Sequence, residues 1–270
     1  MSDDVVTAFR EESDALNALV ADLDEATLLT RTQFKDWTVA DLLGHLYIWN
    51  DAAALTLTNG DAFTAFFSNV VAAMHEPGGL RAFERGLLAE KSATSILDAW
   101  QQSVAATANV YANADPKTRV RWGGPDMSAR SCISARLMET WAHGQAVFDS
   151  FGVARTDTDR IYSIAVLGVN TFAFNHRVNG LDVPDVVPRV TLAAPSGAQW
   201  DLGNPESDAS VTGSATEFCQ VVTQTRNIAD TDLAVTGDTA EHWMRIAQCF
   251  AGPPTPPPAA GTRFLQNPGA

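Results

Sequence analysis

Residues 37–46 read Trp-Thr-Val-Ala-Asp-Leu-Leu-Gly-His-Leu and open a long apolar segment. Thr38, followed three positions later by Asp41, resembles a capping box in which Asp replaces the usual Glu. This pattern predicts a helix from about Val39 to Leu57 that carries His45 among apolar residues. A single histidine in such surroundings is more often a hydrogen-bonded core residue than a ligand, so His45 needs partners before it indicates chemistry.

Residues 136–144 read Arg-Leu-Met-Glu-Thr-Trp-Ala-His-Gly and lie within a predicted helix over 128–150. Glu139 and His143 are four positions apart, so their Cβ atoms lie about 5–6 Å apart on one helix face. Such a pair can bind one metal ion. With His45 from a neighbouring helix, three protein ligands and one open position would match the pattern of catalytic zinc. By spacing alone, a simple charge or hydrogen-bond pair on an exposed helix is the commoner explanation.

Composition limits the partners of the chain. Its 270 residues include 18 Lys or Arg and 32 Asp or Glu, which gives a net charge of −14. Repulsion by phosphates disfavours nucleic acid and anionic membrane surfaces. No apolar run approaches the ~18–20 residues of a membrane span, and the acidic N-terminus lacks the features of a signal peptide. Three cysteines without a CxxC motif predict a cytoplasmic protein with buried thiols at Cys132, Cys219 and Cys249.

Helical periodicity dominates the first two-thirds of the chain. Besides the two helices above, it predicts helices over residues 3–23, 62–74, 80–90, 94–114 and 157–178. After Gly180, short alternating segments predict strands over 189–194, 198–202, 209–212 and 232–236, and helices over 214–225 and 239–250. We therefore predict an α+β protein with a helical bundle over residues 1–180, a small α+β domain over 181–252 and a Pro-rich extended tail over 253–270.

The two quoted stretches, in this order and about ninety residues apart, resemble the DinB/YfiT-like metalloenzyme superfamily. Within it, the chain is similar to the mycothiol-dependent maleylpyruvate isomerase group. The resemblance implies a four-helix bundle that binds a divalent metal, usually zinc, through His45, Glu139 and His143. It also implies a small α/β C-terminal domain that resembles sterol carrier proteins, which fits the change of pattern after Gly180.

The resemblance further implies an enzyme that uses a low-molecular-weight thiol, mycothiol in that group. The thiol would serve to isomerise or S-conjugate a small unsaturated or activated acid. The family has an arginine needed for activity in its C-terminal helix, and Arg226 is our candidate for that role, holding a substrate carboxylate. A solvated arginine near a helix C-terminus is an equally good explanation. Relatives often carry Asp three residues after the second histidine, where this chain has Ala146.

Two other functions stay open on the sequence. A bound metal could activate water or a substrate oxygen, which would make the protein a thiol-independent hydrolase or lyase. The protein could also be non-catalytic and bind a metal together with a small ligand or lipid. Because one bundle fold hosts several chemistries, the sequence leaves open the substrate, the metal, the reaction and the oligomeric state.

Overall fold

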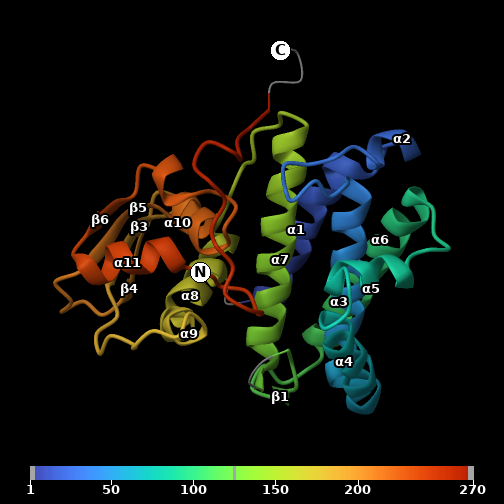
Figure 1. Ribbon diagram of the computed structural model, residues 1–270, viewed down its shortest axis with the longest axis horizontal. Helices are drawn as coiled ribbons and strands as arrows, with labels where there is room; N and C mark the ends of the chain where they lie inside the picture. Colours follow the sequence, from blue (N-terminus) through green and yellow to red (C-terminus); the bar gives the residue numbers. More distant parts are fainter. Residues whose placement is uncertain (1–3, 124–125, 267–270) are drawn as a thin grey trace. The chain divides into compact units, whose positions relative to one another are not determined.

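The computed structural model describes residues 4–123 and 126–266. By internal contacts, the chain divides into two compact units, Met1–Val147 and Phe148–Ala270. The first unit is almost entirely helical, whereas the second combines a sheet with helices (Figure 1). The predicted fold class, a helical bundle followed by a small α+β module, is therefore confirmed.

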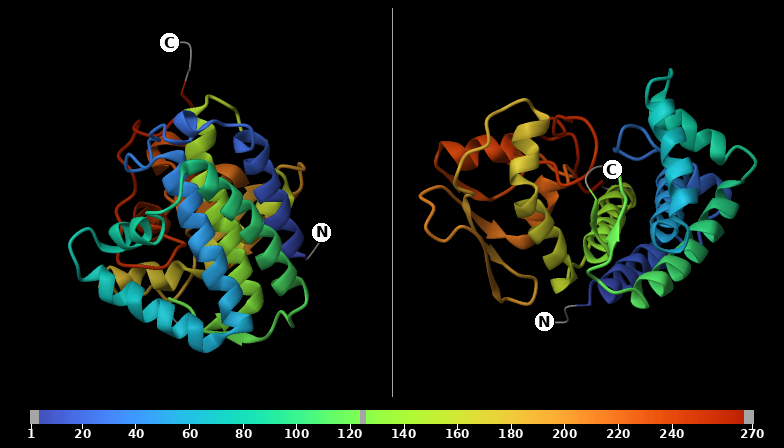
Figure 2. Two further views of the ribbon diagram at one scale, coloured as in Figure 1. Left: turned by 90° about the vertical axis from the view of Figure 1, so that its right-hand side faces the viewer. Right: turned by 90° about the horizontal axis from the view of Figure 1, so that it is seen from below.

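The first unit is built from long helices. They are α1 (Val5–Val20), α2 (Glu25–Leu28), α3 (Val39–Thr58), α4 (Gly60–Met74), α5 (Gly79–Leu87), α6 (Ala93–Ala112) and α7 (Ala129–Ser150), the last of which continues into the second unit. Two short strands, β1 (Arg119–Val120) and β2 (Met127–Ser128), form a hairpin before α7. Helix α6 packs against both α1 and α3, and these helices run lengthwise beside α7 (Figure 2).

Helix α3 begins where the capping box predicts. The Thr38 hydroxyl accepts a hydrogen bond from the Asp41 amide at 3.0 Å, and the Asp41 carboxylate accepts one from the Thr38 amide at 2.9 Å. Two of the amide groups at the helix start are thereby satisfied. This cap fixes the first turn of α3, and His45 lies one turn further along the helix.

A buried polar link ties α7 to the rest of the bundle. Arg136 on α7 donates from Nε to Oδ1 of Asn50 on α3 at 3.0 Å. Asn50 in turn donates to the hydroxyl of Ser103 on α6 at 3.2 Å. All three side chains are buried, and polar groups in such a position are stable only with partners of matching geometry. The link therefore sets the positions of α3 and α7 along one another, and with them the positions of the candidate ligands.

The second unit contains a four-stranded sheet. After η1 (Asp159–Ile161), its elements are α8 (Tyr162–Asn170), α9 (Phe172–Val178), β3 (Arg189–Ala193), β4 (Gln199–Gly203), β5 (Ser210–Ser214), α10 (Ala215–Val222), η2 (Ile228–Asp230), β6 (Ala234–Thr236) and α11 (Asp238–Ile246). The strand order is β4-β3-β5-β6, with β3 parallel to β5 and the other pairs antiparallel. Alternate strand residues are buried on one face, among them Val190, Leu192, Trp200 and Val211.

Two predicted helices differ from the structure. The single helix expected over 157–178 is broken at Thr171, whose hydroxyl donates to the carbonyl of Gly168 at 2.9 Å and competes with the backbone for that acceptor. The last helix ends at Ile246 rather than near 250, because Ala247 turns to an extended conformation and the Cys249 amide donates to the carbonyl of Val222. The short elements α2, β1 and β2 were not predicted, since they carry too few residues for a periodic pattern.

The segment after α11 has no regular structure but is anchored. The Gln224 side-chain amide donates to the carbonyl of Thr255 at 2.7 Å, and Asn227 donates to the carbonyl of Pro258 at 2.8 Å. The last four residues of the predicted tail lie outside the described residues.

The two compact units meet at residues 147 and 148, before the predicted boundary at residue 180. Helices α8 and α9 belong to the second unit because α8 packs against α10 and α9 packs against α11. The predicted domain ranges, 1–180, 181–252 and 253–270, stay predictions.

The cysteines and the apolar character of the helices bear on two further predictions. All three cysteines are buried and free of disulfides, as predicted. Among the helices described, none combines the length and the apolar character that crossing a membrane would require.

Candidate metal centre

Three predicted ligands meet in the first unit. His45 comes from α3, and Glu139 and His143 come from one face of α7. The Oε2 atom of Glu139 lies 3.5 Å from Nε2 of His45 and 3.1 Å from Nε2 of His143. One ligand atom from each residue lies within 4.8 Å of the others. Within residues 4–123 and 126–266, no other group of three His, Cys, Asp or Glu side chains is placed to share a metal ion.

The donor set fits a borderline divalent ion. Two imidazole nitrogens and one carboxylate oxygen are the ligands that zinc takes in catalytic sites with an open position. Ligand atoms at about 2.0–2.2 Å from a tetrahedral centre lie roughly 3.4 Å from one another. The observed separations of 3.1 and 3.5 Å agree with that spacing. The donor types and the two separations from Glu139 therefore fit such an ion, and the three ligand atoms together lie within 4.8 Å of one another.

Nδ1 of His45 contacts a buried acid, Glu84, which the sequence did not single out. This nitrogen lies 2.8 Å from Oε1 of Glu84 on α5, and Trp49 donates from Nε1 to the same oxygen at 2.8 Å. The Glu84 side chain is only 5% exposed. A signal existed in the sequence, because Glu84 shares a helix face with the apolar Leu80 and Leu88. Because Glu84 lies 39 positions after His45 in the sequence, no local pattern links the two residues.

His143 is positioned by aromatic rings. The Phe34 ring meets its imidazole edge-on at 5.0 Å between centroids, and the Trp37 ring lies nearly parallel to it at 6.3 Å. Both rings come from the loop between α2 and α3, in which Lys35 and Asp36 adopt positive φ angles of 52° and 56°. Nδ1 of His143 is buried and has no hydrogen-bond partner among the described residues. His143 contacts Glu139 through Nε2, and on its Nδ1 side aromatic packing rather than a second carboxylate orients the ring.

Electrostatics keep both acids ionised. Burial alone would raise the pKa of Glu139, but hydrogen bonds and charge from His143 and His45 hold that pKa well below its ordinary value. Burial would also raise the pKa of Glu84, yet His45 and Trp49 lower it. Burial would lower the pKa of His45, and the two carboxylates reverse this and raise that pKa to about 9.

The pKa of His143, the other histidine of the candidate centre, shifts in the opposite direction. Burial lowers the pKa of His143 below its ordinary value, and the charge of His45 acts in the same direction. His143 is therefore neutral near pH 7, the form in which an imidazole binds metals.

Arg226, the predicted arginine, lies in the second unit just after α10. Its Nη1 and Nη2 atoms each donate to a carboxylate oxygen of Asp149 at 2.7 Å, and Nη1 also donates to the carbonyl of Thr225 at 2.9 Å. Among the residues that the structure describes, these bonds use three of the five guanidinium hydrogens and leave Nε–H and one hydrogen of Nη2. Ala146, three residues after His143, brings only a methyl group. Besides Glu139, Glu84 contacts a candidate ligand histidine, His45.

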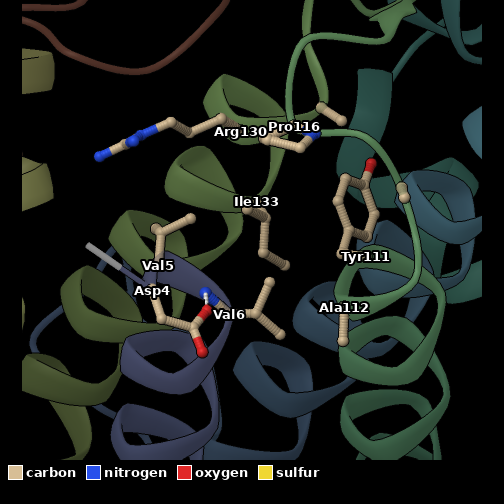
Figure 3. A pocket seen from close by; sticks show the side chains of 10 residues that line it. Asp4, Val5, Val6, Tyr111, Ala112, Pro116, Arg130 and Ile133 are labelled. Atoms are coloured by element: carbon tan, nitrogen blue, oxygen red, sulfur yellow. Dashed lines mark hydrogen bonds between the residues drawn. The ribbon is translucent and has the colours of Figure 1, made fainter. Parts of the chain in front are cut away.

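A separate hollow of about 210 Å³ opens between the start of α1, the end of α6 and the start of α7 (Figure 3). Val5, Val6 and Ile133 form an apolar wall, and the Tyr111 ring faces them. No lining residue belongs to the group around His45, so this hollow has no part in the chemistry considered below.

Comparison with known proteins adds a family match and several relatives. Residues 9–148 match the family model described as the mycothiol maleylpyruvate isomerase N-terminal domain. The uncharacterised proteins Rv0036c and MT0041 of two Mycobacterium tuberculosis strains, H37Rv and CDC 1551, are each 40% identical over 249 residues. In both cases the match covers 92% of this chain and 96% of the relative.

Among solved structures, a crystal structure of the mycothiol-dependent maleylpyruvate isomerase matches with a TM-score of 0.53 at 15% identity. The match covers 87% of this chain and 92% of that one. At this identity the likeness establishes a shared fold.

Proposed function

Because the chain belongs to the mycothiol maleylpyruvate isomerase family, we propose that it is a metal-dependent enzyme that works with a low-molecular-weight thiol such as mycothiol. Its substrate would be a small unsaturated or activated acid, which it would isomerise or conjugate to sulfur. The observation that carries the proposal is the meeting of His45, Glu139 and His143 at ligand spacing in the matched domain. We also propose that the protein is cytoplasmic and has no nucleic-acid partner.

In the proposed enzyme, His45, Glu139 and His143 hold the divalent metal, with zinc as the first candidate. When bound, the metal would stabilise the thiolate form of the thiol, the nucleophile needed for reversible addition to an activated double bond or for displacement of a leaving group. The chain's own part is positional. Phe34 and Trp37 fix the ring of His143 and cover one side of the centre with apolar surface.

Arg226 is proposed to hold the substrate carboxylate. In a chain with a net charge of −14, an anionic substrate needs a local cation, and Arg226 retains two unused hydrogens for it. Asp149 presents the guanidinium in one orientation through two bonds of 2.7 Å. The proposed role of Arg226 therefore depends on its pairing with Asp149.

Metal analysis tests the first half of the proposal. Purified wild type is expected to bind about one equivalent of a divalent metal per chain, and His45→Ala and Glu139→Ala to bind none. His75→Ala serves as the matched control, because this exposed residue at the end of α4 lies outside the centre and its removal should leave metal content unchanged. A wild type that fails to take up added zinc would contradict the metal-dependent function.

Turnover assays test the second half. Unsaturated keto acids are incubated with the metal-loaded protein with and without mycothiol, and isomer and thioether products are quantified. The proposal requires turnover that depends on the thiol. Turnover that ignores added thiol would instead favour hydrolysis or elimination by a metal-activated oxygen.

A further inference from the structure

We propose that Glu84 is a positioning residue of the metal centre, which fixes the tautomer and the ring orientation of His45 so that Nε2 faces the metal. This inference rests on the metal binding proposed above. It is independent of which thiol or substrate is used.

The assignment of the two ring nitrogens follows from their neighbours. Nε2 of His45 faces Glu139 at 3.5 Å, on the side where the three ligand atoms gather. Nδ1 faces Glu84 at 2.8 Å. An ionised carboxylate only accepts hydrogen bonds, so Nδ1 keeps its proton beside Glu84, and Nε2 is the nitrogen whose proton a bound metal would replace. Glu84 thus selects one tautomer.

Two side chains of α3 contact one oxygen of the Glu84 carboxylate. His45 and Trp49 are one helical turn apart, and both direct an N–H group to Oε1 of Glu84 at 2.8 Å. A buried acid is stable only when its charge is balanced and its oxygens are hydrogen-bonded. The contacts therefore fasten α5 to α3 at the turn that carries the ligand, and a rotation of the His45 ring would break the bond to Glu84.

The two ligand histidines are held in different ways. Nδ1 of His143 has no hydrogen-bond partner among the described residues, and its ring is fixed by contacts with Phe34 and Trp37. Of these two histidines, only His45 has a carboxylate at its Nδ1 among the residues that the structure describes. A partner of this kind also raises the basicity of the ligand nitrogen, and its loss typically costs about 10–100-fold in metal affinity. Metal affinity should accordingly depend on the charge at position 84.

The test compares Glu84→Gln with Glu90→Gln, which removes the same charge from an exposed residue shortly after α5. Zinc affinity is measured by competition with a chelator, and the ligand field is read from the visible absorption bands of the Co²⁺-loaded proteins. We expect Glu84→Gln to lower zinc affinity by about 10–100-fold and to shift the Co²⁺ bands. Trp49→Phe, which keeps the carboxylate but removes its second donor, should produce a smaller change. Glu90→Gln should match wild type.

The zinc affinity and Co²⁺ spectrum of Glu84→Gln distinguish a positioning role of Glu84 from no role. If folded Glu84→Gln binds zinc as tightly as wild type with an unchanged Co²⁺ spectrum, the positioning role is wrong while the metal site stands. If wild type binds no metal, both the inference and the proposed function fail. Should Glu84→Gln not fold, ¹⁵N NMR of the zinc-loaded wild type provides the decision. A protonated Nδ1 and a metal-bound Nε2 on His45 support the role, and the reverse assignment overturns it.

Discussion

The ion pair between Arg226 and Asp149 is expected to contribute strongly to the stability of the second unit. Both side chains are nearly inaccessible, with 12% and 3% of their surfaces exposed. Their two bonds of 2.7 Å form the bidentate geometry in which guanidinium and carboxylate interact most strongly. Replacing either partner should therefore lower the free energy of unfolding far more than replacing a surface charge does.

The magnitude follows from the burial of the acid. Breaking a buried pair by removing one partner costs about 3–5 kcal/mol, because the other charge stays in a poorly solvated place. Since Arg226 retains some exposure, we expect Arg226→Met to cost about 3 kcal/mol, near the lower end of that range. Asp149→Asn should cost a similar amount. The double variant should cost about 2 kcal/mol less than the sum of the two, because neither member of the pair is left buried without the other.

The assay is a double-mutant cycle read by hydrogen exchange. Amides of β3 and β5 in the sheet core report the opening of the second unit, and chemical denaturation gives the global value. Arg245→Met, which removes an exposed arginine from the end of α11, is the matched control and should change stability by less than about 0.5 kcal/mol. Single-variant costs that add to within about 0.5 kcal/mol would refute the pair as a coupled unit. Loss of activity in Arg226→Met could then be assigned to substrate binding alone.

Two further predictions concern the helix cap and the thiols. Thr38→Ala removes the acceptor for the Asp41 amide and should lower the free energy of unfolding by about 1 kcal/mol, measured by urea denaturation. A loss below about 0.3 kcal/mol would show that the cap is unimportant. Burial raises the pKa of Cys132 to about 11, and the thiolate is the form that reacts. Folded protein should therefore react slowly with a disulfide reagent at pH 8 and faster as the pH approaches 11, whereas rapid labelling of Cys132 at pH 8 would contradict its burial.

The features that could be predicted from the sequence are local ones. The capping box of α3 and the four-residue spacing of Glu139 and His143 each depend on one helix alone. Bringing His45 to that pair required the family resemblance, since spacing within one helix says nothing about its neighbour. The break at Thr171 was missed because apolar periodicity continues across it while a side-chain hydrogen bond interrupts the backbone pattern. Glu84 was missed because its partner lies on another helix.

His45 and His143 are oriented by different contacts, so substitutions near the centre should have two different kinds of effect on metal binding. A change at Phe34 or Trp37 alters the space around the His143 ring but leaves the charge of the centre unchanged. A change at Glu84 alters charge and proton position at His45 while the ring keeps its packing against Trp37. Substitutions of the first kind should therefore affect the geometry of the ligands, and those of the second kind their donor strength. An assignment of any residue here to catalysis needs both metal affinity and ligand field to be measured, because activity alone does not distinguish these two causes.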